Sequence, residues 1–374
     1  MKLTQTLRTF ISSDRAPGII LIACTIISLS VSNILPQYAA FWHINIGHHS
    51  LIHWINDGLM TIFFLLIGLE LEREVYQGEL STIRSAMLPA LAALGGMVVP
   101  AAIYFLFNAG ADGNLAGIGV PMATDIAFAL AALSLAGKRV PAGLKIFLTA
   151  LAVIDDLGAI LVIAIFYTST IHWLNLGIAG GIFTLLLVFN RLKVHNPVPY
   201  LLGGVIMWYF MMGSGVHATI TGVLVAFAIP FGSGDKQTLS YRLEHWLSKP
   251  VAFFILPIFA LANTSITIDQ SFYRELGSAV SIGIMAGLFA GKPIGILLFT
   301  YTTVKLKLSK LTQGITWKHI FGAGLLGGIG FTMSIFISLL AFNDPSLVDH
   351  AKISVMIASL LSGLAGLLFL RRTS

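Results

Sequence analysis

The sequence predicts an all-α polytopic membrane protein with about 12 transmembrane helices, forming one integral membrane domain over residues 1–374. Composition is the first reason, because 10% of the side chains are charged, 56% are hydrophobic and the mean hydropathy is +0.89. Soluble globular chains carry about 25% charged residues. The composition therefore excludes a cytosolic enzyme, a nucleic-acid-binding protein and a disordered scaffold.

The second reason is the recurrence of apolar segments close to the roughly 20 residues that a helix needs to cross a bilayer. No soluble domain separates these segments, and the longest polar stretch, residues 232–249, is too short to fold alone. The predicted spans lie at residues 16–35, 55–70, 86–108, 115–136, 142–168, 174–190, 198–212, 214–231, 250–265, 278–302, 318–342 and 353–370.

The basic residues predict which side of the membrane each loop faces, because Lys and Arg are retained in cytoplasmic loops. With the N-terminus inside, the 22 Lys and Arg residues fall on the cytoplasmic side except for Arg274, Lys352 and the membrane-embedded Lys292. A wrong number of spans would scramble this alternation. We therefore expect both termini to be cytoplasmic.

Two of the predicted spans are interrupted by helix-breaking residues. Gly117 to Asp125 reads GIGVPMATD, and Gly327 to Ser334 reads GGIGFTMS. Paired interruptions in the two halves of a chain are typical of transporters with inverted-topology repeats and binding sites at the bilayer midplane. We expect two broken, crossing helices here, although glycines can also serve only to let helices pack closely.

Four charged residues lie deep within apolar sequence: Asp125, Asp155, Asp156 and Lys292. Such charges cost about 2.5–3.5 kcal/mol each to insert, so they are functional candidates by default. Removing a carboxylate from water and placing a second one beside it both favour the protonated form, and the pair titrates as a unit. Once ionised, Asp155 and Asp156 offer the hard oxygen ligands that small cations prefer. A helix cap or a plain salt bridge is the alternative role.

The other candidates surround this pair or lie at the membrane surface. Lys292 can pair with Asp155 when no cation is bound, or form a purely structural ion pair. Asp125, next to Thr124, can compensate the positive ends of broken helices or bind a cation. His217 is a structural histidine or a pH sensor. Glu70, Glu72, Arg73 and Glu74, with Arg242, Glu244 and His245 in another loop, form either solvated helix flanks or a pH-responsive ionic network.

Six motifs give the chain a family resemblance. They are ATDIAFAL, KIFLTALAVIDDLGAI, SGVHAT, RLEH, GKPIGI and GIGFTMSIFI. In this order and spacing they are similar to the bacterial NhaA sodium/proton antiporter family, over nearly the whole chain. That family is itself a known example of inverted repeats with broken helices, so this resemblance and the repeat argument are not independent.

The resemblance implies an electrogenic, pH-regulated antiporter of the bacterial inner membrane. It would exchange cytoplasmic Na⁺ or Li⁺ for a larger number of protons, through alternating access to a midplane site. Asp155 and Asp156 would bind the cation and the protons, with Lys292, Asp125 and Thr124 in support. The residues implied in the pH response are Glu70, Arg73, Glu74, His217, Glu244 and His245. The family also forms homodimers through the external segment, here residues 37–50.

The residues themselves leave other functions open. A passive cation channel needs rings of ligands along a pore, whereas this chain offers one isolated ionisable site. Another sodium-coupled transporter would need more polar groups at membrane depth for an organic substrate. An intramembrane aspartyl protease needs two carboxylates that share a proton, which Lys292 would disturb. No phosphate-binding GxxxxGK[ST] loop is present, so a proton gradient would supply the energy and no cofactor is expected.

Overall fold

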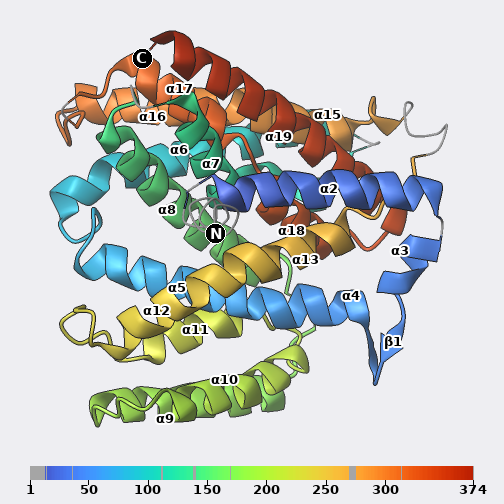
Figure 1. The fold of residues 1–374 in the computed structure, drawn as a ribbon, viewed down its shortest axis with the longest axis vertical. Coiled ribbons are helices and arrows are strands. Elements are labelled where there is room, and N and C mark those ends of the chain that lie inside the picture. Colours follow the sequence, from blue (N-terminus) through green and yellow to red (C-terminus); the bar gives the residue numbers. More distant parts are fainter. Residues whose placement is uncertain are drawn as a thin grey trace, which may run out of the picture. The chain divides into compact units, whose positions relative to one another are not determined.

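The computed structural model describes residues 13, 15–35, 37–110, 113–137, 140–168, 170–268, 275–312 and 314–373 (Figure 1). Within these ranges the structure is helical apart from one short hairpin. In chain order the elements are α2 (Ala16–Ile34), α3 (Gln37–Trp42), β1 (Asn45–Ile46), β2 (His49–Ser50), α4 (Leu51–His53), η1 (Trp54–Leu59), α5 (Met60–Tyr76), α6 (Ile83–Asn108), η2 (Leu115–Met122), α7 (Ile126–Ala136), α8 (Ala142–Phe166), α9 (Trp173–Arg191), α10 (Pro197–Met212), α11 (Ile220–Ala228), α12 (Leu239–Pro250), η3 (Val251–Ile255), α13 (Leu256–Asn263), α15 (Ala279–Ala286), η4 (Gly287–Gly291), α16 (Lys292–Lys305), α17 (Trp317–Gly327), α18 (Phe331–Ala341) and α19 (Pro345–Thr373). Here η2 is a 3₁₀-helix, and η1, η3 and η4 are π-helical turns within longer helices.

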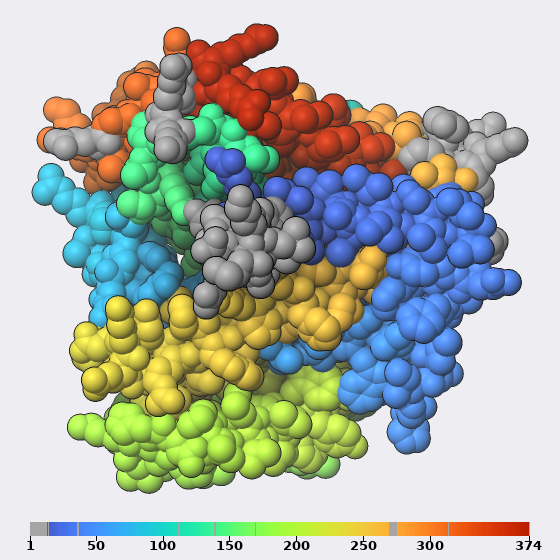
Figure 2. Space-filling view, in the orientation of Figure 1, coloured from blue at the N-terminus to red at the C-terminus, as the bar shows by residue number. Residues whose placement is uncertain are grey.

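The chain folds into two compact units. Unit 1 is drawn from Met1–Tyr38, Thr82–Ala159 and Asn263–Ser374, and unit 2 from Ala39–Ser81 and Ile160–Ala262. In unit 1, α6 packs against α15 and α16, and α19 packs against α17 and α18. In unit 2, α5 packs against α11 and α12. The helices α9 and α10 pack against each other and form the yellow-green band of Figure 2. Each unit therefore joins segments that are distant in the sequence.

The number of helices long and apolar enough to cross a membrane is nine over the described ranges, or ten if the bent pair α17–α18 is one span. Two shorter apolar helices, α10 and α11, occupy the predicted spans at 198–212 and 214–231. The all-α membrane fold is therefore confirmed, whereas the count of twelve remains a prediction. Five charges used to predict the orientation lie outside the described residues: Lys2, Arg8, Lys138, Arg139 and Arg274.

Two local predictions are wrong. The expected span at 214–231 contains only the nine-residue helix α11, because its first residues form turns in which Gly215 adopts a positive φ of 86°. Arg242, Glu244 and His245, expected in a loop, lie instead on the helix α12. This helix is strongly amphipathic, with Leu243 and Leu247 buried on one face, so a stretch that reads as polar overall still folds against unit 2.

A glycine contact brings α6 and α16 close together in unit 1. A Cβ atom added to Gly95 would lie 2.3 Å from the carbonyl oxygen of Gly295, and one added to Gly295 would lie 2.1 Å from that of Gly95. Only glycine permits this approach of two backbones, as is common between membrane helices. The contact fixes α16, whose first residue is Lys292, against α6.

The segment 37–50 contains a short hairpin. β1 and β2 pair antiparallel, with Asn45 opposite Ser50 and Ile46 opposite His49. The hairpin leads directly into α4 and η1 of unit 2, where Trp54 Nε1 donates a hydrogen bond to the carbonyl oxygen of Ile46, at 3.0 Å. The hairpin is thus anchored to the start of the helix that follows it.

Candidate functional site

The two interrupted segments of unit 1 meet at their breaks. In the first, η2 is followed by three non-helical residues, 123–125, before α7 begins. In the second, α17 and α18 are separated by residues 328–330 and bent by 47°. The amide of Asp125 donates a hydrogen bond to the carbonyl oxygen of Ile329, at 2.6 Å, and the Ser334 hydroxyl donates to that of Val120, at 2.7 Å. Both predicted breaks are therefore present and lie against each other.

Asp125 caps two half-helices at once. Its Oδ1 accepts a hydrogen bond from Phe128 N, at 3.0 Å, which caps α7. Its Oδ2 accepts from Thr332 N, at 3.0 Å, and from the Thr332 hydroxyl, at the first turn of α18. Free N–H groups at a helix start carry partial positive charge, and a carboxylate satisfies them. The contacts of Asp125 are those of the expected electrostatic compensator.

Asp155, Lys292 and Thr124 form one connected cluster beside this crossing. Lys292 Nζ forms an ion pair with Asp155 Oδ2 and donates to Thr124 Oγ1, at 2.8 Å. Thr124 Oγ1 lies 2.7 Å from Asp155 Oδ2 and 2.8 Å from the carbonyl oxygen of Gly327. A hydroxyl has one proton and can donate to only one of these two acceptors at a time. All three side chains are completely buried.

Asp156 adjoins this cluster on α8. It is completely buried, as is Asp155, and its carboxylate acts electrostatically on Lys292. Successive helix residues point about 100° apart, so the carboxylates of Asp155 and Asp156 leave α8 in different directions. Asp155 Oδ1 accepts no hydrogen bond from any described residue. This part of α8 lies close to α6, and Gly158 leaves room for the Met97 side chain. A Cβ atom added to Gly158 would lie 2.2 Å from Met97 Sδ.

The cluster provides the chemistry that sequence reasoning expected at the midplane. The carboxylates, the Thr124 hydroxyl and the Gly327 carbonyl offer hard oxygen atoms, the ligand type of Na⁺ and other hard cations. The Lys292 ammonium is the cation that balances the charge of Asp155 in this structure. Breaking a fully buried pair by removing one partner costs about 3–5 kcal/mol. Whatever displaces Lys292 must therefore replace its positive charge.

The acidic and basic residues expected at the membrane surface assemble in unit 2. Arg73 on α5 forms an ion pair with Glu244 on α12, and a longer one with Glu74, at 3.6 Å. Glu70 lies close enough to Glu244 to interact electrostatically. His245 is exposed on α12, and its ring stacks on that of Tyr241 with the centroids 6.2 Å apart. These residues therefore form ion pairs between α5 and α12, and Glu244 and His245 lie on a helix and not in a loop.

His217 is separate from that network. It lies in the turn before α11, and its Nε2 is 2.8 Å from the carbonyl oxygen of Tyr167. Burial lowers the pKa of His217 below its usual value, although the hydrogen bond to Tyr167 and the nearby carboxylate of Asp57 oppose the shift. Asp57 is near the start of the long helix that ends in α5 and also pairs with His53, at 3.2 Å. Arg73 is 16 residues further along that helix, about 24 Å away.

Sequence reasoning missed two residues that the structure connects to the candidates. Thr332 provides two of the three donors to Asp125, and Asp57 faces His217. Glu72, considered above as a helix flank or a member of an ionic network, is buried and accepts a hydrogen bond from the Ser240 hydroxyl, at 3.3 Å. The available signals were a threonine two residues past the second break and a carboxylate within an otherwise apolar segment.

Comparisons with known proteins agree over almost the entire chain. A family model described as Na⁺/H⁺ antiporter 1 matches residues 8–370. A Flavobacterium psychrophilum protein named Na(+)/H(+) antiporter NhaA is 59% identical over 368 residues, covering 98% of this chain and 96% of that protein. A Flavobacterium johnsoniae protein, Na(+)/H(+) antiporter NhaA 1, is 57% identical, covering 99% and 98%. A Cytophaga hutchinsonii protein named Na(+)/H(+) antiporter NhaA is 56% identical, covering 100% and 97%.

Proposed function

Because the chain belongs to the NhaA family of Na⁺/H⁺ antiporters, we propose that it exports cytoplasmic Na⁺ or Li⁺ in exchange for a larger number of incoming protons. Members of this family are transporters and not enzymes, which excludes the aspartyl protease interpretation. They need no cofactor, and Na⁺ and H⁺ are their substrates. The energy comes from the proton gradient.

Asp155 and Asp156 are the site at which cation and protons compete. The observation that carries this assignment is their complete burial beside Lys292 and Thr124, where the two broken segments meet. Ionised carboxylates bind the cation, and protonated ones do not. Lys292 pairs with Asp155 while the cation is absent, and an arriving Na⁺ takes over its role as counter-charge. The Thr124 hydroxyl can change its acceptor during this exchange, because it can donate its hydrogen bond either to Asp155 or to the carbonyl oxygen of Gly327.

Two carboxylates at one site make the exchange electrogenic. When both are protonated, they and Lys292 carry one positive charge in total. When both are ionised around one Na⁺, the same groups together with the Na⁺ carry no net charge. A cycle between these two states moves more than one proton inward for each Na⁺ moved outward. Each net charge gains about 2.3 kcal/mol per 100 mV from the membrane potential.

The broken segments are the elements that change access. Half-helices end at the crossing, so the site can open toward either side without unpairing the backbone of a complete span. We propose that residues 1–374 act as one antiporter domain of twelve spans with inverted-topology repeats and both termini in the cytoplasm. The protein belongs in the bacterial inner membrane on this proposal, and the hairpin within residues 37–50 forms part of a homodimer interface.

Regulation by pH is assigned to two groups of residues in unit 2. Arg73, Glu74, Glu244 and Glu70 form an ion-pair network between α5 and α12, with His245 at its edge. Protonating a carboxylate there weakens the contact between two helices. His217 responds separately, at the other end of the long helix that contains α5.

The test is cation-linked proton movement in everted membrane vesicles that hold a respiration-driven pH gradient. NaCl, LiCl or KCl is added across roughly pH 6–9, the range in which a coupled buried carboxylate pair should titrate. Wild type is compared with Asp155→Asn and Asp156→Asn, and the exposed Asp235→Asn serves as the matched control. We expect Na⁺ and Li⁺ to dissipate the gradient in wild type and the control, and in neither site variant.

Two results would contradict the proposal in different ways. If wild type shows no cation-linked proton flux at any pH, the exchange itself is wrong, and a channel or another sodium-coupled transporter must be considered again. If both site variants remain active, the exchange stands but its site lies elsewhere. Recordings at several membrane potentials test electrogenicity, because an electroneutral exchange would not respond to voltage.

A further inference from the structure

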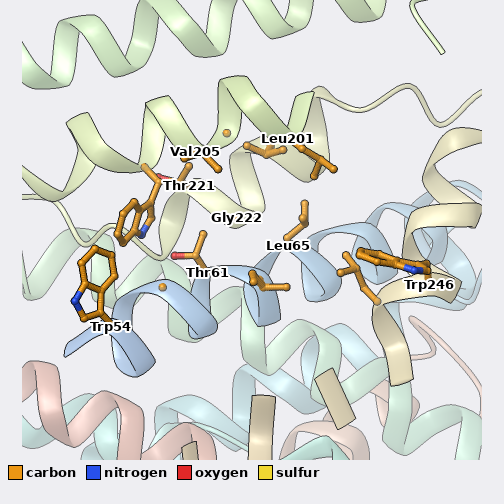
Figure 3. A pocket seen from close by; sticks show the side chains of 14 residues that line it. Trp54, Thr61, Leu65, Leu201, Val205, Thr221, Gly222 and Trp246 are labelled. Atoms are coloured by element: carbon orange, nitrogen blue, oxygen red, sulfur yellow. The ribbon is translucent and has the colours of Figure 1, made fainter. Parts of the chain in front are cut away.

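Unit 2 contains an apolar groove that the antiport mechanism does not use. It has a volume of about 420 Å³ and lies between η1–α5, α10, α11 and α12 (Figure 3). Leu65, Leu201 and Val205 line its middle, Trp54 lies at one end and Trp246 at the other. The groove is partly open, because Val205 and Trp246 are both about two-thirds exposed. Its occupant must therefore come from the surrounding membrane.

The groove is long enough for an acyl chain. From Trp54 at one end to Leu65 in its middle, eleven residues at 1.5 Å each give about 16 Å, and the groove continues to Trp246. This is roughly half of the ~30 Å hydrocarbon thickness of a bilayer, the depth that one leaflet contributes. Tryptophans concentrate where the hydrocarbon meets the polar headgroups. The hairpin end has two tryptophans, Trp54 and Trp208, whose rings lie 6.0 Å apart, whereas the other end has one, Trp246, so the paired rings favour the hairpin end as the interfacial one.

Two unpaired polar atoms also lie in the groove, near this end. Trp208 Nε1 and Thr221 Oγ1 are buried and have no hydrogen-bond partner among the described residues. Trp54 Nε1, in contrast, is satisfied by the carbonyl oxygen of Ile46. An unpaired buried donor costs about 1–3 kcal/mol, so a ligand that accepts hydrogen bonds here gains affinity. Water is a poor candidate, because an ordered buried water needs two to four polar partners, and the other hydroxyl of the lining, that of Thr61, already donates to the carbonyl oxygen of Asp57.

We propose that this groove binds one acyl chain of a glycerophospholipid from the leaflet on the hairpin side. The ester carbonyl accepts hydrogen bonds from Trp208 Nε1 and Thr221 Oγ1, and the chain extends past Val205 and Leu201 toward Trp246. A hydrocarbon tail with a single polar group at one end matches the single polar end of the groove. The bound lipid fills the space between α5 and α10 and so acts as a structural part of unit 2.

The experiment measures lipid retention by the purified full-length protein. Native mass spectrometry follows phospholipid bound per chain through graded delipidation, and dibrominated phosphatidylglycerol is then titrated back while tryptophan fluorescence is recorded. Gly58 lines the groove, and a Cβ atom there would meet nothing within 4 Å, so Gly58→Leu fills the groove without a clash. Gly180 on α9 is equally open but lies outside the groove, so Gly180→Leu is the matched control.

Wild type and Gly180→Leu should each retain one phospholipid per chain and show quenching that saturates near one added lipid. Gly58→Leu should lose both the retained phospholipid and the saturable quenching. Trp208→Phe leaves the groove open but removes one hydrogen bond, so retention should weaken about fivefold. This variant and the wild-type titration remain informative even if Gly58→Leu does not fold.

Three results would overturn the proposal. The first is a Gly58→Leu variant that retains its lipid. The second is wild-type quenching that rises without saturation, which would indicate only general contact with bulk lipid. The third is quenching that disappears when the protein dimerises, which would assign the groove to a second copy of the chain.

Discussion

Replacing Asp125 by Ala should destabilise the crossing of the two broken segments more than any other single substitution of a polar residue there. Three donors lose their acceptor: Phe128 N, Thr332 N and the Thr332 hydroxyl. Loss of the helix cap at Phe128 costs about 1 kcal/mol. The two bonds from Thr332 to a charged acceptor contribute about 1.5–3 kcal/mol each. The structure therefore predicts a total loss of about 4–7 kcal/mol.

The assay is thermal unfolding of the purified protein in detergent, followed by size-exclusion chromatography after heating. Asp125→Asn keeps the size of the side chain and one acceptor oxygen, but its NH₂ group then faces a hydrogen-bond donor. Its melting temperature should therefore lie between those of wild type and Asp125→Ala. Thr332→Val removes only the hydroxyl bond and should cost about 1.5–3 kcal/mol. Gly180→Ala, on an open face of α9, supplies the control for expression and handling.

Coupling between the two residues gives a sharper test. Asp125 and Thr332 share their hydrogen bonds, so the loss in the double variant Asp125→Ala/Thr332→Val should be smaller than the sum of the single losses, by about 1 kcal/mol or more. Strictly additive losses would mean that the two side chains do not interact. An Asp125→Ala protein that melts at the wild-type temperature would refute the double-cap interpretation outright.

Three further predictions concern other parts of the chain. Lys292→Met leaves Asp155 buried without its counter-charge, which should lower the free energy of unfolding by about 3–5 kcal/mol. Na⁺-dependent proton flux in vesicles should then fall about tenfold or more, and it should recover partly in Lys292→Arg. Because burial lowers the pKa of His217, stability should be full above about pH 6.5 and decline as the pH falls, and melting curves of His217→Gln should lack that decline. Gly222→Ala places a Cβ atom 2.2 Å from the Thr61 carbonyl oxygen, so it should lower the melting temperature through a loss of about 1–3 kcal/mol, unlike Gly180→Ala.

Hydropathy located most of the fold because spans are long and every one of them must be apolar. The span predicted at 86–108 is observed as Ile83–Asn108, and that at 174–190 as Trp173–Arg191. The predictions of secondary structure failed in two segments where the length and the mean composition do not reflect the local structure. The segment 214–231 is apolar on average, yet its first residues form turns, and the polar segment 232–249 contains the amphipathic helix α12. A sliding average cannot separate a buried face from an exposed one.

The candidate site could be located from the sequence but not assembled. Asp125, Asp155, Asp156 and Lys292 stand out because charges inside apolar segments are costly and rare. Nothing in the order of residues places Thr332 against Asp125, 207 positions earlier, or gives Asp125 two helix ends to cap. Such pairings depend on which helices pack together.

The sequence by itself determined that this chain lies in a membrane, where its helices break and which charges are embedded, because each of these follows from local composition and spacing. The tertiary structure decided the partners: Lys292 with Asp155, Asp125 with both half-helices, and Arg73 with Glu244. It also separated His217 from the Arg73 network and formed the groove between α5 and α10. The physical reason is that hydrogen bonds and ion pairs form over about 3 Å, and only packing brings distant segments that close.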